Sequence, residues 1–178
     1  MCQHKFVGNG RERIMDGMLD RRPVIVGVDG SPRSIDALRK AAEMARLLDA
    51  PITAVTAWQF PITFDGSFPT EIWSPEGEAE RILSAAIVTA FPDERPERLT
   101  AVTIAGPAAS VLITASENAS MLVLGSRGRG GFAGLLLGSV STACAQHARC
   151  PVLLMHGSPG TTKDSAAETR RAERDPAM

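Results

Sequence analysis

The chain alternates short, continuous apolar runs with longer stretches in which apolar residues recur every three or four positions. A short run rich in Val, Ile and Leu is typical of a strand buried on both faces of a parallel sheet. A period of three to four residues is typical of a helix that buries one face. Five runs therefore predict strands, at residues 24–28, 52–57, 99–104, 121–124 and 151–155.

The segments between these runs carry helix-start signals. Ser31-Pro32 and Ser74-Pro75 each place an N-cap residue before a proline suited to the first turn. Helices are predicted from these residues to about Leu48 and Ala90, with a short helix after Gly106-Pro107 and a last one at about residues 139–148. Strands that alternate with helices predict an α/β fold: one doubly wound domain whose five-stranded parallel sheet has helices on both faces.

Three segments lack this periodicity. Residues 1–22 and 157–178 are polar, and we predict a disordered N-terminal arm, a domain at 23–156 and a disordered C-terminal tail; Met15 and Met18 are alternative start positions. Residues 58–73 hold five of the eight aromatic side chains, interrupted by prolines and glycine. They are interpreted either as a surface loop folded back on the core or as a lid or subunit contact.

Composition excludes several classes of function. The 19 basic and 20 acidic residues give a net charge of −1, which disfavours a nucleic-acid groove or a polybasic membrane surface. Neither a membrane-spanning run nor the apolar core of a secretory signal is evident, and three cysteines do not suggest a disulfide framework. We therefore expect a cytoplasmic protein with no nucleic-acid or membrane partner.

The most informative stretch is Met121–Ser141. Its apolar run opens into a loop in which six of the fourteen residues from Gly125 to Gly138 are glycine, and Arg127 and Arg129 lie among them. Glycines let the backbone come close to a ligand, and a helix start offers free N–H groups. A strand, a glycine loop, two arginines and a helix start together predict an anion site, and we interpret the anion as a nucleotide phosphate chain. A loop that only turns the chain is the alternative.

Two familiar phosphate motifs do not fit this stretch. No Gly-Lys-Ser/Thr closes the loop, so it is not a P-loop. Residues 128–133 match the dinucleotide pattern G-x-G-x-x-A, but they follow a late strand, and no Asp or Glu occurs between Phe132 and Lys163 to hold a ribose. Cys144, His147 and Cys150 suggest a zinc site, but a fourth ligand is not evident, and we interpret them as a packed thiol and a helix-end histidine.

The spacing Gly125-x2-Gly128-x9-Gly138-Ser139 resembles the universal stress protein family in its ATP-binding branch. Val26–Ser31 resembles the family's opening strand and turn, and His147–Leu153 its closing passage, so the likeness covers roughly Pro23 to His156. The resemblance implies the sheet order 3-2-1-4-5 of the adenine nucleotide alpha hydrolase-like fold. It also implies a ligand at the switch point between strands 1 and 4.

The resemblance also assigns residues to the site. It implies Asp29 near the adenosine or its metal, although an Asp before glycine also forms turns. It implies contact with adenine at Ala57 and, more loosely, with the region of Gly106. The backbone of the loop and the helix start would hold phosphates, and each arginine either neutralises phosphate charge or is solvated. The predicted cofactor-binding set is Asp29, Gly30, Ser31, Ala57, Gly106, Gly125, Ser126, Arg127, Gly128, Arg129, Gly130, Gly131, Gly138, Ser139, Val140 and Ser141.

We therefore expect a nucleotide-dependent regulatory or stress-response protein that binds ATP with Mg²⁺. A slow ATPase or phosphotransferase and a nucleotide-free dimeric scaffold are the alternatives. The glycine loop contains no Asp, Glu, His or Gln that would position a water for hydrolysis, so the residues favour binding, and no catalytic or metal-ligand residue is assigned. The resemblance implies a homodimer through the last strand, and residues 151–155 form an uncharged run that would suit an edge.

Overall fold

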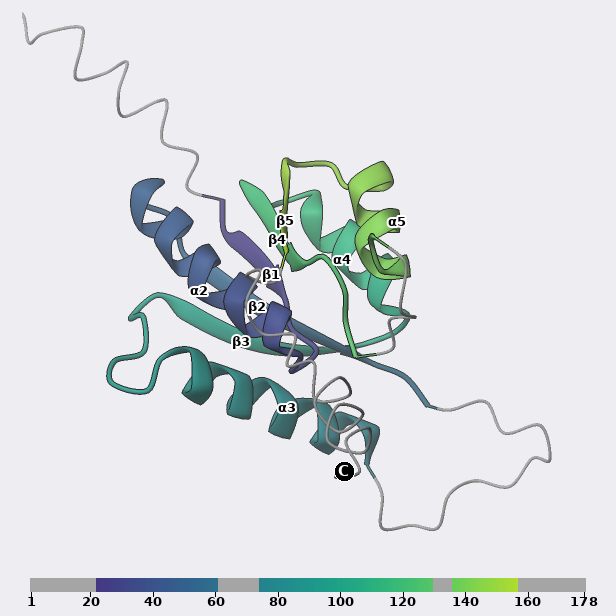
Figure 1. Ribbon diagram of the computed structural model, residues 1–178, viewed down its shortest axis with the longest axis horizontal. Coiled ribbons are helices and arrows are strands. Elements are labelled where there is room, and N and C mark those ends of the chain that lie inside the picture. Colours follow the sequence, from purple (N-terminus) through teal and green to yellow (C-terminus); the bar gives the residue numbers. More distant parts are fainter. Residues whose placement is uncertain (1–21, 61–73, 130–135, 157–178) are drawn as a thin grey trace, which may run out of the picture.

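The computed structural model describes residues 22–60, 74–129 and 136–156. Within them, five strands alternate with four helices (Figure 1). The strands are β1 (Val24–Gly27), β2 (Ile52–Trp58), β3 (Leu99–Ala105), β4 (Met121–Gly125) and β5 (Val152–Met155), and the helices are α2 (Pro32–Leu47), α3 (Pro75–Ala90), α4 (Ala108–Ser116) and α5 (Ser139–His147).

All strand pairs are parallel, in the order β3-β2-β1-β4-β5. The chain builds outward from β1 to β3 in one direction and then returns to place β4 on the other side of β1. Val24 pairs with Ile52 of β2 and with Met121 of β4, so β1 is central. The predicted fold class and sheet order are confirmed, and the switch point lies between β1 and β4.

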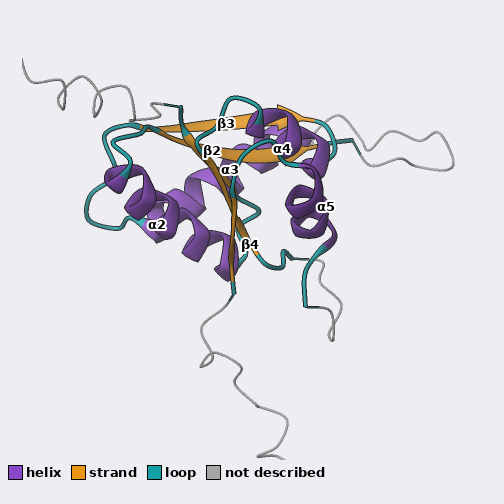
Figure 2. Cartoon of the chain, turned by 90° about the horizontal axis from the view of Figure 1, so that it is seen from above, coloured by secondary structure: helices purple, strands orange, loops and turns teal. Residues whose placement is uncertain are grey.

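The helices cover both faces of the sheet. Helices α2 and α3 lie on one side, and α4 and α5 lie on the other (Figure 2). Alternate side chains of β1 supply the two cores: Val24 and Val26 pack toward α2 and α3, whereas Ile25 packs with the cluster that includes Leu112 of α4 and Cys144 of α5. The continuous apolar runs of the sequence follow from this burial on both faces.

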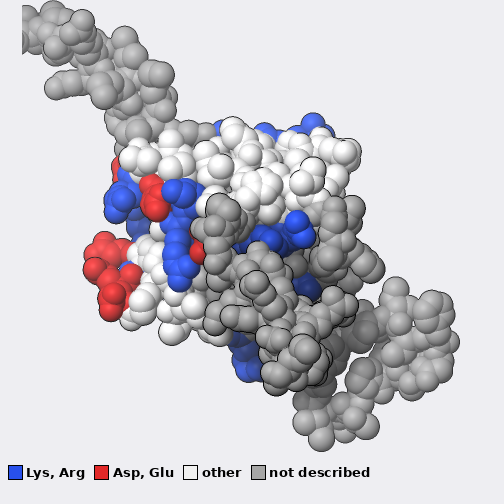
Figure 3. All heavy atoms as spheres, viewed as in Figure 1, with Lys and Arg blue, Asp and Glu red and all other residues white. Residues whose placement is uncertain are grey.

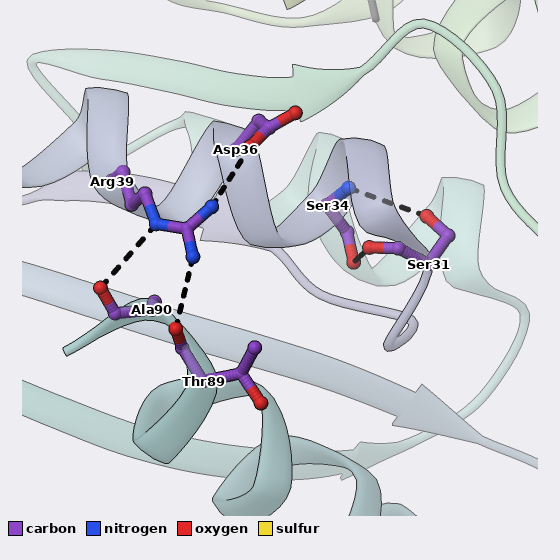
Figure 4. A network of polar contacts seen from close by, with 6 residues as sticks. All are labelled: Ser31, Ser34, Asp36, Arg39, Thr89 and Ala90. Carbon is purple, nitrogen blue, oxygen red and sulfur yellow. Dashed lines mark hydrogen bonds and ion pairs between the residues drawn. The ribbon is translucent and has the colours of Figure 1, made fainter. Parts of the chain in front are cut away.

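Each boundary has a local cause. The Ser31 hydroxyl accepts a hydrogen bond from the amide of Ser34 at 3.2 Å and so caps α2 (Figure 4). The Ser74 hydroxyl accepts one from the amide of Gly77 at 3.1 Å and caps α3. Both helices then begin at proline, as predicted, because proline lacks the N–H that the first turn leaves unpaired.

Arg39 joins the two helices on the α2 side. Its guanidinium donates hydrogen bonds to the carbonyl of Thr89 at 2.9 Å and to the carbonyl of Ala90 at 3.4 Å, and it pairs with Asp36 on its own helix (Figure 4). These carbonyls belong to the last turn of α3, which has no basic residue of its own. Arg39 therefore supplies the cation that a helix C-terminus favours.

Some expectations lie outside the described residues. These are the predicted tail, the arm except for Arg22, and most of the aromatic segment 58–73. Trp58 and Phe60 are described, and their rings meet edge to face with centroids 5.6 Å apart. In the described part of the chain, we find no helix that is both long enough and apolar enough to span a bilayer.

We predict that Arg39→Ala lowers the free energy of unfolding by about 1 kcal/mol, because two carbonyls at the end of α3 lose a charged donor. Urea denaturation measures this change. Lys40→Ala is the matched control, since Lys40 pairs with Glu43 of its own helix; such pairs near the surface contribute about 0.5 kcal/mol or less. Equal losses in both variants would contradict the proposed tie between α2 and α3.

Candidate functional site

A cavity of about 420 Å³ opens at the carboxyl ends of β1, β2 and β4. Binding pockets for small molecules typically have this size, and open α/β sheets bind ligands at this position. Its walls come from the strand ends, the start of α2, one side chain of α3, the start of α4, the loop after β4 and the start of α5. The lining residues are Gly27, Val28, Asp29, Ser34, Val55, Thr56, Ala57, Ile82, Ala108, Leu112, Leu124, Gly125, Arg127, Gly128, Arg129, Gly138, Ser139, Val140 and Ser141.

The cavity brings most of the predicted site residues together. Among the described residues of that set, Asp29, Ala57 and those of the loop and helix start line it, except for Ser126. Gly30, Ser31 and Gly106 do not line it, and Gly130 and Gly131 lie outside the described residues. Ser31 instead caps α2, and Ser126 is buried, with its amide bonded to the carbonyl of Met155 at 2.8 Å.

Sequence reasoning missed most of the apolar wall. Ile82 of α3 and Leu112 of α4 fit the helical period of core residues, and nothing in their spacing marks them as lining a pocket. Val55, Leu124 and Ala108 complete this wall. The Thr56 hydroxyl donates to the carbonyl of Val28 at 2.8 Å, so its polar atom is satisfied within the protein. One part of the cavity therefore offers an apolar surface suited to a flat ring.

Asp29 follows the end of β1 by two residues, at the switch point where the strand order reverses. One carboxylate oxygen accepts a hydrogen bond from the amide of Ser31 at 3.0 Å, and the other accepts one from the amide of Arg129, also at 3.0 Å. Burial raises the pKa of Asp29, but hydrogen bonds from Ser31, Arg129 and Ser34 outweigh it, so the pKa lies below its ordinary value. The side chain is therefore a carboxylate at neutral pH.

Two glycines of the motif, and Gly30 in the facing turn, lie so close to other parts of the protein that a side chain would not fit. A Cβ on Gly125 would lie 3.0 Å from the backbone of Arg33, so glycine lets α2 approach the end of β4. A Cβ on Gly128 would overlap the Asp29 carboxylate. Gly30 has φ of 77°, a left-handed conformation that favours glycine, and a Cβ there would overlap the Arg129 guanidinium.

The start of α5 differs from those of α2 and α3. Its N-cap is Gly138, and no side chain caps it. The amide of Thr142 is the first to bond back, to the carbonyl of Gly138 at 2.9 Å. The Ser141 hydroxyl donates to the carbonyl of Gly125 at 2.8 Å, which ties the helix to β4. The first-turn residues Ser139 and Val140 line the cavity, so their N–H groups and the positive helix end favour an anion there.

The described residues do not form a resident metal site. No group of three or more His, Cys, Asp or Glu side chains among them is arranged to hold a metal ion. Cys144 is fully buried in the core, and burial raises the pKa of its thiol to about 11. The observed packing agrees with the interpretation of Cys144 as a small apolar side chain.

Comparison with known proteins identifies the family. Residues 20–156 match the sequence model of the Universal stress protein family. A universal stress protein of Mycobacterium tuberculosis is 36% identical over 138 residues, which are 76% of this chain and 46% of the relative. One from Mycolicibacterium smegmatis is 37% identical over 139 residues, with the same shares of 76% and 46%. The chain belongs to the universal stress protein family. It spans about half the length of these relatives.

Solved structures of universal stress proteins share the fold. One in complex with cAMP has a TM-score of 0.58 at 27% identity, over 77% of this chain and 98% of that chain. Another, from Archaeoglobus fulgidus in complex with dAMP, has a TM-score of 0.54 at 26% identity, over 75% and 96%. The predicted adenine nucleotide alpha hydrolase-like fold is confirmed by this likeness and by the strand order.

We predict a pH signature for Asp29. Because the pKa of Asp29 is lower in the folded protein than the ordinary aspartate value of about 3.9, the ionised carboxylate stabilises the fold above that value. This stabilisation is lost as the pH falls through the lower, folded pKa. The difference in free energy of unfolding between wild type and Asp29→Asn should be constant above about pH 5 and narrow below about pH 4. Urea denaturation at each pH measures it, and a difference that widens on acidification would contradict the assignment.

Proposed function

We propose that this universal stress protein binds ATP in the cavity at the switch point and acts as a nucleotide-dependent regulatory protein. The observation that carries the proposal is that one cavity contains both the apolar wall and an uncapped helix start. A nucleotide has the matching parts, a flat base and an anionic phosphate chain. An anion-binding loop alone would not need the apolar wall.

The phosphates would lie at the start of α5. No side chain caps the start of α5, so the N–H groups of Ser139 and Val140 can donate to a ligand. The helix dipole adds a positive field there. The loop arginines Arg127 and Arg129 also line the cavity and would offset phosphate charge. Gly130 and Gly131 remain proposed members of the phosphate loop.

The adenosine would lie toward Asp29 and the end of β2. Ala57 and Val55 supply a small apolar surface there, and Ile82 and Leu112 extend it from the two helix layers. That two solved family members are complexes with cAMP and with dAMP supports an adenine nucleotide as the ligand. We keep Gly30, Ser31, Gly106 and Ser126 as supports of the site, since they flank the lining without forming it.

Magnesium would arrive with the nucleotide. Mg²⁺ is commonly held by phosphate oxygens, waters and one or two carboxylates. Among the lining residues that the structure describes, Asp29 is the one carboxylate. A single carboxylate fits a metal ion that arrives with ATP better than one bound to the protein alone. The metal ion would neutralise part of the phosphate charge.

The site favours binding over hydrolysis. A slow ATPase or phosphotransferase needs a group that positions the attacking nucleophile. Both oxygens of Asp29 already accept backbone hydrogen bonds, and neither His nor Glu occurs in the described lining. We therefore propose a binding protein of the cytoplasm, whose downstream partner reads the bound state.

We also propose a homodimer through β5. This strand is the sheet edge next to β4, and its residues Val-Leu-Leu-Met are all partly exposed and uncharged. The surface over β4, β5, α4 and α5 shows few charged side chains in Figure 3, whereas charges of both signs gather toward α2 and α3. An uncharged strand edge favours pairing with a second strand.

We predict that Ser139→Asp abolishes ATP binding without destabilising the free protein. The negative charge of an aspartate in the first turn of α5 interacts favourably with the positive end of the helix dipole, but it repels phosphate. For wild type, ATP at 100 times its Kd should stabilise the fold by about 2.7 kcal/mol, or roughly 5 to 10 °C in Tm. Thermal unfolding with and without ATP measures the shift.

Ser110→Asp is the matched control for this experiment. Ser110 is exposed in the first turn of α4, another nine-residue helix without a side-chain cap, and it does not line the cavity. This variant should keep the full ATP shift. A normal shift in Ser139→Asp would overturn the phosphate site, and many phosphates released per bound ATP would favour the ATPase alternative.

We predict that Leu154→Pro gives a monomer. The carbonyls of Pro151 and Met155 accept hydrogen bonds from Leu122 of β4 and from Ser126 just after it, so by alternation the N–H of Leu154 faces the outer edge of the sheet. Proline removes that donor without breaking the β4 ladder. Sedimentation measures the mass, and Leu154→Ala, which keeps the N–H, should remain dimeric. A dimer in both variants would exclude strand pairing at this edge.

A further inference from the structure

The Asp29 carboxylate connects two segments that are a hundred residues apart in the chain. Its two oxygens accept backbone hydrogen bonds of 3.0 Å, one from Ser31 in the turn between β1 and α2 and one from Arg129 in the loop after β4. Both partners are main-chain N–H groups, so the contact fixes the path of the backbone on each side.

Gly128 precedes the bonded amide and shows what this contact requires. A Cβ on Gly128 would overlap one oxygen of Asp29 and lie 3.4 Å from its carboxyl carbon. The φ of Gly128 is outside the left-handed region, so the backbone strain that favours glycine at Gly30 does not apply here. The missing side chain is needed here as clearance for the carboxylate.

Gly138, the third glycine of the spacing, differs. A Cβ there would meet its nearest atom, the Cα of Arg127, at 3.5 Å, which is ordinary van der Waals contact. Nothing in the protein therefore requires glycine at this position by overlap. The two glycines belong to one motif but meet different surroundings.

The Arg129 side chain makes a second contact with the same turn. Its guanidinium lies over Gly30, in space that a Cβ on that residue would occupy, and its Cζ is 3.2 Å from that ideal position. The start of the loop is thus held twice against the β1–α2 turn, by the amide and by the side chain of Arg129.

We propose that Asp29 is a positioning residue for the phosphate loop, and that Gly128 is glycine because the Asp29 carboxylate must reach the Arg129 amide. The contact fixes the end of the segment 126–129 against the β1–α2 turn, while its start is bonded to α5, because the amide of Gly138 donates to the carbonyl of Ser126 at 2.8 Å. With the loop fixed on both sides, the first-turn residues Ser139 and Val140 line the cavity. The effect of this contact on ligand affinity rests on the proposed nucleotide function. The contact between Asp29 and the Arg129 amide does not depend on it.

A double-mutant cycle tests the proposal in the nucleotide-free protein. Gly128→Ala should raise the unfolding equilibrium constant at least tenfold in wild type, but less than about threefold in Asp29→Ala, where the carboxylate is gone. Gly138→Ala, the matched control, should have the same effect in both backgrounds because it does not meet Asp29. Equal effects of Gly128→Ala in both backgrounds would overturn the proposal.

Hydrogen exchange separates a positioning role from a general loss of stability. In Asp29→Ala the Arg129 amide should exchange at least about tenfold faster, while the buried β4 amide of Val123 keeps its rate relative to global unfolding. Unchanged exchange at Arg129 would overturn the proposal. If Asp29→Ala does not fold, Asp29→Asn, which places a donor where one oxygen accepted, completes both measurements.

Titration of the same proteins with ATP keeps the two proposals distinguishable. If Asp29 positions the loop, Gly128→Ala weakens ATP binding at least about tenfold in wild type and less than about threefold in Asp29→Ala. If Gly128 instead clears space for phosphate, the loss is the same in both. If wild type does not bind ATP, the proposed nucleotide function is wrong. The double-mutant cycle and the hydrogen-exchange data would still test whether Asp29 positions the loop.

Discussion

The pairing of β1 with β4 is the constraint on which the site depends. Parallel pairing places the carboxyl ends of both strands at one edge of the sheet, and the chain reverses its building direction between them. The helices that follow these strands, α2 and α5, pack on opposite faces of the sheet, so a crevice is left between them at this end. The cavity of this universal stress protein follows from the topology before any particular side chain is considered.

The side chains then divide the crevice into two environments. Apolar residues from β2, α3 and α4 form one wall, and the uncapped start of α5 forms the other. Asp29 also lines the cavity, and both of its carboxylate oxygens accept backbone hydrogen bonds. A partly buried carboxylate near the proposed phosphate site would repel the ligand unless its charge is balanced locally, and these two amides provide part of that balance. Its lowered pKa reflects the same hydrogen bonds, which exceed the opposing effect of burial.

The sequence predicted the elements well because their signals are local. Apolar runs at Val24 and Met121 and the Ser-Pro starts of α2 and α3 need no knowledge of distant residues. The glycine spacing also located the loop end of the cavity. The contributions of Ile82 and Leu112 could not be predicted, because a residue on the inward face of a helix looks the same in sequence whether it meets the core or a cavity. The tight contact between Gly128 and Asp29 could not be predicted either. The two residues are about a hundred positions apart in the sequence, and only the folded structure shows how closely they approach.

The central claim is that the phosphate end of a nucleotide meets the first turn of α5. Backbone amide chemical shifts, followed by NMR during titration with ATP and, separately, with adenosine, test it most directly. The account predicts that the amides of Gly138, Ser139 and Val140 shift with ATP and not with adenosine, while residues at the end of β2 such as Ala57 respond to both. Shifts at the start of α5 that are the same with adenosine, or ATP-induced shifts that leave this turn unchanged, would contradict it.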